Sequence, residues 1–474
     1  MTEIRGLLLL GALLVGGFWL FFGVLQDVVA GDPLVRADRA VLHFFEALRA
    51  DWVDRAAAAL VALGTASVIL AVAAAMLLWL LWRRAWRAAL YELGAIAGTA
   101  AFAIGMQVAL PGGALAPTPP AVPGSWPGAG LPPAWQMAEV TALFTFLAVL
   151  VVREGNARHA VVVPLAVALL LVLLGFARLY LGIDWLSTIL AAAAFGVAWV
   201  AFLGLLLSLA DLSHRPRPAR PRGLLAAATI AFVVAGGATI GFAHPRQARH
   251  FAAERPIARI SLDVWRDGGW AGLPERRVSI FGQHGAPLTL QWAGRLDGLK
   301  ADLAAHGWKR PIPWSWRSAL EWLSPRSGPA ALPVLPHLQD GRPESLVRVE
   351  TGPPLGSRER IVLRVWPSGT VVTDGARRLP LWIGAVTIER IAPVSFLFTT
   401  AVGEKRVMPA VKALHTALPA AAVVRRADLA GYRGWDGTVL IGQADGNGSP
   451  DLSAGKPSRV MPDAIPAAFC RHRR

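Results

Sequence analysis

Seven long runs of apolar residues fill the first half of this 474-residue chain and restrict what it can fold into. An α-helix rises about 1.5 Å per residue, so about 20 apolar residues cross the roughly 30 Å hydrocarbon core of a bilayer. The runs extend from Gly6 to Leu25, Ala56 to Trp82, Ala88 to Leu110, Ala134 to Val152, Ala160 to Ala177, Trp185 to Ala210 and Gly223 to Ala243. We expect seven transmembrane helices. The first is interpreted as a retained anchor rather than a cleaved signal peptide, because six further spans follow it.

Basic residues between the runs predict the orientation of the chain. The arginines that indicate the orientation lie before the first span and after the second, fourth and sixth spans: Arg5, Arg83, Arg84, Arg87, Arg153, Arg158, Arg215, Arg217, Arg220 and Arg222. These are alternate connectors, and cytoplasmic loops of membrane proteins are enriched in Lys and Arg. The intervening residues 26–55 also hold arginines, but acidic residues balance them, and residues 111–133 carry no charge. An odd number of spans then places the residues after Ala243 outside the cytoplasm. The sequence predicts a multi-pass protein of the bacterial inner (cytoplasmic) membrane, with a cytoplasmic N-terminus and a periplasmic or extracellular C-terminal domain.

Three ionisable residues lie at the predicted outer ends of the spans. Glu139 is near the start of the fourth span, Arg178 ends the fifth, and Asp184 precedes the sixth. Charged groups in a membrane are costly, so they indicate a functional site or a neutralised cluster. This group could bind a phosphate, relay protons or form a structural ion pair. A fourth residue, Glu92, lies near the inner end of its span and is expected to snorkel toward the arginines just before that span.

The segment around Arg178 resembles a known signature. Ala177-Arg178-Leu-Tyr-Leu-Gly-Ile-Asp184-Trp-Leu-Ser-Thr188 is similar to the third signature of the type 2 phosphatidic acid phosphatase superfamily, commonly SRLYLGVHWLSD. Gln136 to Thr141 stand where that family has Pro-Ser-Gly-His-Ala-Thr, and the uncharged loop 111–117 stands where it has its first signature. The resemblance covers roughly residues 30 to 210 and implies a six-helix phosphatase-like core.

The resemblance also implies roles that this chain largely lacks. In the family one histidine attacks phosphorus, a second protonates the leaving group, and basic residues bind the phosphoryl oxygens. Here Asp184 stands at the nucleophile position, Glu139 at the acid position and Thr188 at the orienting aspartate, while Arg178 alone is retained as a phosphate-binding candidate. Two carboxylates would repel a bound phosphate. We therefore interpret Glu139, Arg178 and Asp184 as a vestigial site and expect no catalysis by the family mechanism.

The second half of the chain is basic and has the patterning of a folded domain. From residue 244 onward it holds 32 basic and 19 acidic residues. Arg295 to His306 and Glu404 to Leu418 show helical periodicity, whereas the segments around Leu290, Leu363 and Pro380 to Glu389 alternate as strands. Trp314, Trp316 and Trp322 lie near Arg310 and Arg317; these tryptophans either form an aromatic-basic face for a membrane or ligand, or pack in the core.

This half resembles the LssY carboxy-terminal domain family over about residues 250 to 420. The matching residues are Gly269-Trp270-Ala-Gly-Leu-Pro, Pro287-Leu-Thr-Leu-Gln-Trp292-Ala-Gly, Ala305-His-Gly307-Trp308, Arg364-Val-Trp366 and Leu381-Trp382-Ile-Gly384-Ala. The resemblance implies a domain that accompanies membrane phosphatase-like modules. It gives no role to the isolated polar residues Asp267, His284 and Glu321, which we do not expect to be catalytic.

The predicted fold is an all-α polytopic membrane bundle, with a six-helix phosphatase-like core plus a seventh span, followed by a soluble α+β domain. Residues 1–210 form the core, 211–222 a cytoplasmic linker rich in Pro and Arg, and 223–243 the seventh helix. Residues 244–441 form the extracytoplasmic domain, and 442–474 a disordered tail. The single cysteine, Cys470, excludes an intramolecular disulfide.

These observations favour an integral inner-membrane protein that resembles lipid phosphatases but lacks most of their catalytic residues. It would bind a phosphorylated or polyprenyl lipid, or a protein partner, at the outer leaflet. The alternative is a membrane lipid-phosphate phosphohydrolase with rearranged catalytic residues; a third class is a transporter using Glu139, Arg178 and Asp184 as a polar path. Membrane lipids are the expected partners. We expect no nucleic acid, no cofactor and no metal site.

Overall fold

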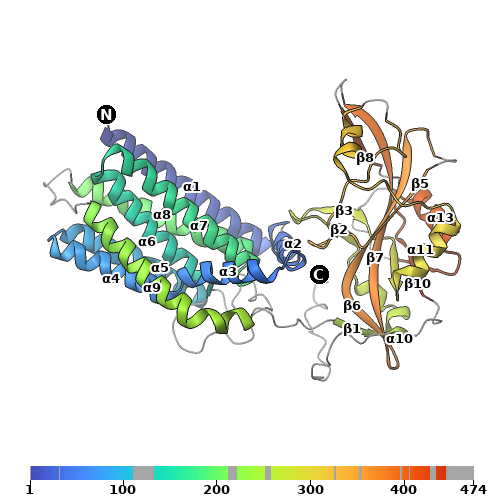
Figure 1. Cartoon of the computed structure of the whole chain (residues 1–474), viewed down its shortest axis with the longest axis horizontal. Coiled ribbons are helices and arrows are strands. Elements are labelled where there is room, and N and C mark those ends of the chain that lie inside the picture. The colour runs from blue at the N-terminus through green and yellow to red at the C-terminus, as the bar shows by residue number, and fades with distance from the viewer. Residues whose placement is uncertain are drawn as a thin grey trace.

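The computed structural model describes residues 2–30, 33–109, 133–211, 221–250, 258–324, 327–351, 355–394, 398–404, 406–426 and 434–444. The predicted first-signature loop at 111–117, most of the linker and nearly all of the tail lie outside these residues. Figure 1 shows a bundle of helices, the helical half, at one end and a domain built on a sheet, the C-terminal domain, at the other.

The helical half contains the predicted spans. Its helices are α1 (Thr2–Ala30), α2 (Pro33–Ala47), α3 (Asp51–Leu63), α4 (Ala66–Trp82), α5 (Trp86–Ala109), α6 (Pro133–Glu154), α7 (Ala157–Tyr180), α8 (Leu186–Asp211) and α9 (Pro221–His250). Among the described residues, seven segments are helical, long and apolar enough to cross a membrane, with α3 and α4 together forming one of them. The prediction of seven apolar spans is therefore confirmed, and they fit a multi-pass membrane protein.

The surface of the bundle is apolar in the way that lipid contact requires. Large side chains such as Leu70, Leu165, Val172 and Ile230 point outward and are exposed. Inside the bundle, small residues let helices approach closely: a Cβ on Gly98 would overlap the Trp199 ring. Close contact at small residues is typical of helix packing in membranes, where the hydrophobic effect does not drive association.

Three features of the helical half differ from the predicted layout. The second span is broken after Leu63, where Gly64 and Thr65 separate α3 from α4, and Gly64 packs so closely against Leu174 of α7 that a larger side chain would displace the leucine side chain. The predicted connector between the first two spans contains the helix α2, which packs against α7 and α8. The linker is also shorter than predicted, because Pro221 and Arg222 already belong to α9.

The C-terminal domain is α+β, as predicted, and its centre is one curled sheet. Its main strands run in the order β1 (Ala258–Ser261), β6 (Glu359–Asp374), β7 (Arg377–Val394), β4 (Leu290–Ala293), β10 (Thr438–Gln443) and β9 (Ala422–Arg425). Strand β5 (Leu346–Glu350) pairs with β6, and β8 (Phe398–Gly403) pairs with β7. Strands β2 (Arg276–Val278) and β3 (His284–Pro287) form a separate hairpin.

The two faces of the β6–β7 hairpin are covered differently. On one face Ile361, Leu363 and Val365 pack against α11 (Leu296–Ala305) and α13 (Met408–Ala417). Figure 1 shows these two helices on the side of the sheet that faces away from the helical half. The opposite face is crossed by an irregular segment, residues 327–340, which we call the strap.

The shorter helices and the strand ends refine the predicted pattern. The helices α10 (Leu262–Arg266) and α12 (Trp316–Leu320), with the 3-10 turns η1 (Gly269–Gly272) and η2 (Glu321–Leu323), complete the domain. Helix α13 begins later than predicted because β8 extends to Gly403. Strand β10 includes Gly442 and Gln443, which had been assigned to the tail.

Candidate functional site

The ends of α7 and α8 bring Arg178 and Asp184 together. Helix α7 ends in a tight turn where Gly182 has a positive φ of 67° and Ile183 N donates to Arg178 O at 2.9 Å. This C-terminal glycine turn reverses the chain and returns Asp184 to the last turn of the helix. Arg178 Nε donates to Asp184 Oδ2 at 2.5 Å, and both side chains are almost fully buried.

Helix α6 contributes the other predicted residue of this site. Gln136, at the start of α6, lies 3.5 Å from the Arg178 guanidinium through its Oε1. Glu139 is one turn further along the same helix and is half-buried. Thr188, at the position of the orienting aspartate, is buried in α8. The structure therefore places the predicted residues on neighbouring helix ends and shows Arg178 held by Asp184.

A further polar residue, Asp38 on α2, joins the site and was not predicted. Its two carboxyl oxygens accept hydrogen bonds from Ser187 N at 2.8 Å and Ser187 Oγ at 2.6 Å. Asp38 thus caps the first turn of α8 from another helix, where a negative charge meets free N–H groups. Burial raises the pKa of Asp38 to about 6, although the two bonds from Ser187 oppose that shift. Nothing in the local sequence links Asp38 to a residue so distant along the chain.

Glu92 does not behave as predicted. Its side chain is buried inside α5, and within the described part of the chain neither carboxyl oxygen has a hydrogen-bond partner. The prediction that Glu92 snorkels toward Arg84 or Arg87 is therefore wrong. The reason is geometric, because the residue faces the packed interior of the bundle and not its surface.

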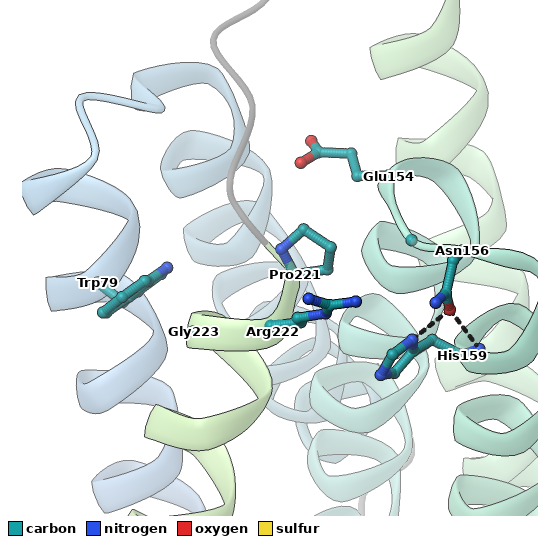
Figure 2. A pocket seen from close by; sticks show the side chains of 8 residues that line it. Trp79, Glu154, Asn156, His159, Pro221, Arg222 and Gly223 are labelled. Atoms are coloured by element: carbon teal, nitrogen blue, oxygen red, sulfur yellow. Dashed lines mark hydrogen bonds between the residues drawn. The ribbon is translucent and has the colours of Figure 1, made fainter.

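A hollow of about 430 Å³ lies where the end of α4, the end of α6 and the starts of α7 and α9 meet (Figure 2). It is lined by Trp79, Glu154, Gly155, Asn156, His159, Pro221, Arg222 and Gly223. Asn156 caps the start of α7 by accepting a hydrogen bond from His159 N at 3.0 Å. The lining carries both a carboxylate and a guanidinium, so its charge favours neither anions nor cations.

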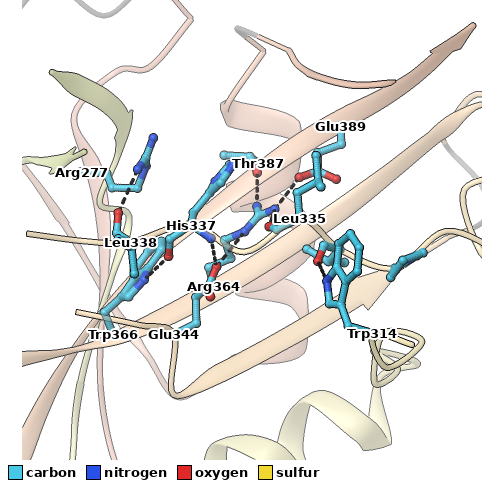
Figure 3. Close-up of polar contacts among 12 residues, drawn as sticks. Arg277, Trp314, Leu335, His337, Leu338, Glu344, Arg364, Trp366, Thr387 and Glu389 are labelled. Atoms are coloured by element: carbon cyan, nitrogen blue, oxygen red, sulfur yellow. Dashed lines mark hydrogen bonds and ion pairs between the residues drawn. The ribbon is translucent and has the colours of Figure 1, made fainter. Parts of the chain in front are cut away.

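The C-terminal domain contains a buried polar cluster on the strap face of the sheet (Figure 3). Glu389 on β7 lies opposite Arg360 on β6 and pairs with it at 2.9 Å, and with Arg364 at 2.6 Å. Burial raises the pKa of the Glu389 carboxyl, but the two guanidinium groups outweigh burial and leave the pKa below its ordinary value. Glu344 lies 3.5 Å from Arg364 and extends the cluster.

This cluster holds the strap on the sheet. The strap contains three prolines, which lack N–H groups, so it is rich in carbonyl acceptors and poor in donors. Side chains supply the donors in the bonds Arg360 to Pro329 O, Leu332 O and Pro333 O, Arg364 to Leu335 O, Trp366 to His337 O, Trp314 to Val334 O and Arg277 to Leu338 O. Arginine suits this task because its five N–H donors satisfy several buried carbonyls at once.

The histidine in the strap remains neutral near neutral pH. Burial, together with the positive charges of Arg364 and Arg277, lowers the pKa of His337 to about 4, although the negative charge of Glu389 opposes the shift. Its backbone N–H donates to Glu344 Oε1 at 2.5 Å. The cluster therefore acts as a fixed set of donors and acceptors, with each charge engaged in holding the chain in place.

The end of the strap contacts the helical half through α2. His43 Nδ1 lies 2.8 Å from Asp340 Oδ2, and Arg36 Nε donates to Gly282 O at 2.8 Å. Gly282 and Gly341 both have positive φ, and a Cβ on either would overlap a backbone oxygen of α2. Figure 1 shows α2 facing the β2–β3 hairpin. Helix α2 thus links the Arg178 region on one side to the C-terminal domain on the other.

The tryptophans near Arg310 and Arg317 were predicted either to form an aromatic-basic face or to pack in the core. Trp314 and Trp316 are exposed rather than buried in the core, and the Arg317 guanidinium lies 5.1 Å from the centre of the Trp316 ring. Trp322 is half-buried in η2. Core packing is therefore wrong for the first two tryptophans, and the aromatic-basic surface exists.

Comparison with known proteins supports one of the two resemblances. Residues 270–414 match a protein family described as the LssY C-terminus, a segment that covers less than a third of the chain and includes the polar cluster and the strap. No curated protein and no solved structure matches the chain. The match lies outside the helical half, so the resemblance of that half to lipid phosphatases gains no support from it. The chain combines seven apolar helices with a C-terminal domain similar to the LssY C-terminus.

Proposed function

We propose that this chain is a multi-pass protein of the bacterial inner membrane that acts by binding at the outer membrane surface and not by phosphate transfer. In this proposal the α2 end of the bundle faces the periplasm or the cell exterior, as the arginine pattern predicts. The observation that carries the proposal is the buried ion pair in which Arg178 is held by Asp184 at 2.5 Å.

A phosphate that took the Nε donor of Arg178 would have to displace Asp184. The displaced carboxylate would then be buried without its partner, which typically costs about 3–5 kcal/mol. Asp184 and the half-buried Glu139 would also place negative charge beside the phosphate. The ion pair has a structural role instead, because it joins the end of α7 to the start of α8. Asp38 in turn joins α2 to α8.

The proposed ligand is an anionic lipid, either phosphorylated or polyprenyl. We propose that its headgroup binds near α2 instead of at Arg178. Arg36 of α2 and Arg276 of β2 both lie close enough to His284 to lower its pKa, after burial, while Glu275 opposes them. Arg39 of α2 is exposed on the same helix. Clustered arginines at a membrane surface attract anionic headgroups.

The proposal is tested with the purified full-length chain in nanodiscs. Phosphate release from phosphatidic acid and undecaprenyl pyrophosphate is measured for the wild type and for Arg178→Ala. We expect no turnover from either, and a large fall in the thermal stability of Arg178→Ala because Asp184 is left unpaired. The paired variant Arg178→Met with Asp184→Leu is the matched control, and it should regain most of the lost stability. Turnover by the wild type that a folded Arg178→Ala protein lacks would overturn the proposal.

A further inference from the structure

Large apolar side chains are exposed together on α12 and η2 of the C-terminal domain. Trp316 is 71% exposed, Leu320 52% and Leu323 60%. Phe398 of the adjacent strand β8 is also exposed, and Thr399 Oγ1 binds Ser324 O at 2.8 Å, which holds η2 against β8. We call Trp316, Leu320, Leu323 and Phe398 the apolar patch. Exposed apolar groups gathered in this way mark a contact surface.

The apolar patch lies on the strap face of the sheet. Trp314, just before α12, donates from its indole to Val334 O of the strap at 2.7 Å. The other end of the strap reaches α2, where Asp340 meets His43. Because α11 and α13 cover the opposite face, the strap face is the side of the domain turned toward the membrane-spanning helices (Figure 1).

The orientation of the bundle brings this side to the level of the bilayer. In Figure 1 the helix axes slope from upper left to lower right. A membrane surface at the α2 end would lie at right angles to these axes, and it would pass near the β8 end of the domain and away from α10. A second exposed aromatic residue marks the same level. Phe281, which is 75% exposed, lies in the β2–β3 turn beside Gly282, the residue that touches α2.

We propose that the C-terminal domain rests on the bilayer, with the apolar patch and Phe281 inserted into the interfacial region of the leaflet on the α2 side. The chemistry fits this partner, because tryptophan concentrates at membrane–water interfaces and aliphatic side chains enter the acyl boundary. Arg317, stacked on the Trp316 ring, is placed to meet headgroup phosphates. The domain is tethered beside the membrane by α9 and α2, so a shallow contact needs no further recruitment.

The test uses the full-length chain in nanodiscs of phosphatidylcholine and phosphatidylglycerol, with Cys470→Ser to remove the native thiol. A spin label is attached at Leu320→Cys, and a second protein carries it at Leu323→Cys. Val264→Cys on α10 is the matched control, since Val264 is 57% exposed but lies at the far end of the domain. Collision with oxygen, which concentrates in lipid, is compared with collision with a water-soluble nickel chelate.

We expect the oxygen-to-nickel collision ratio at Leu320 and Leu323 to be several-fold higher than at Val264. Equal ratios at all three positions would show that the patch faces water and would overturn the proposal. Protection from both reagents at Leu320 and Leu323 would show that protein covers the patch, and would overturn it equally. Neither outcome depends on phosphate turnover, so the proposed function is judged separately.

Discussion

Removal of the Glu389 carboxylate tests whether the buried cluster holds the C-terminal domain together. Arg360 and Arg364 are 1% and 2% exposed, and Glu389 is the carboxylate that both of them share. In Glu389→Ala two guanidinium groups would remain in a dry interior without their common partner. Arg360 would also lose the contact that orients it toward Leu332 O at 2.7 Å.

The expected loss follows from the cost of unpaired buried charge. Breaking a buried ion pair by removing one partner costs about 3–5 kcal/mol. For a domain of this size, roughly 2–4 °C of melting temperature accompany each kcal/mol, so the transition should fall by about 6–20 °C. Thermal unfolding of the full chain in nanodiscs, followed by tryptophan fluorescence, measures this shift. Chymotrypsin cleavage within the strap should accelerate in parallel.

An exposed carboxylate provides the control. Asp297 pairs with Arg295 at 2.9 Å and with Lys300 at 3.0 Å, but it lies at the surface, where water screens the interaction. Asp297→Ala should leave the melting temperature unchanged. If Glu389→Ala has the same melting temperature as Asp297→Ala, the cluster does not hold the strap and the interpretation of its charges is wrong.

Two further predictions concern α2. Its Asp38 has a pKa of about 6 in the folded chain against an ordinary 3.8, so the folded state binds more protons between these values and loses stability as pH rises through 6. Unfolding of the helical half should therefore be about 1 kcal/mol more costly at pH 5 than at pH 7, and Asp38→Asn should remove the difference. Gly341→Ala should separate the two halves, because its Cβ would overlap Ala40 O. Gly375→Ala is the control, since Gly375 also has a positive φ but faces open space, and it should leave the two halves in place. The distance between fluorophores on the two halves measures the separation.

The sequence predicted the spans well because the signal is local. About 20 consecutive apolar residues leave a helix little choice but to cross the membrane, and each run can be recognised without its neighbours. The break at Gly64 could not be found in this way. It depends on Leu174 of α7 packing against the glycine, and that contact joins residues far apart in the chain.

The candidate site was predicted only where its residues are close in sequence. Arg178 and Asp184 are separated by one tight turn, so their pairing could be inferred from spacing and the position of Gly182. Asp38 meets Ser187 through a contact that no periodicity encodes, and its helix was interpreted as a connector. The charged residues of the C-terminal domain carried one usable signal: Arg360 and Arg364 alternate with apolar residues on one face of β6.

Helix α2 contacts both halves of the protein and so couples the candidate site to the C-terminal domain. Asp38 faces the start of α8, while Arg36 and His43 on the same helix face the turns at Gly282 and Asp340. A rigid helix cannot move one of these contacts without affecting the others, so any ligand that shifts α8 or α2 would also shift the strap. Under the proposed binding function this coupling needs no chemistry at Arg178, because a ligand shifts an equilibrium only by the difference in its affinity for the two arrangements. The Arg178–Asp184 ion pair joins the ends of α7 and α8, so a shift of α2 relative to this pair would have to break the bonds between Asp38 and Ser187.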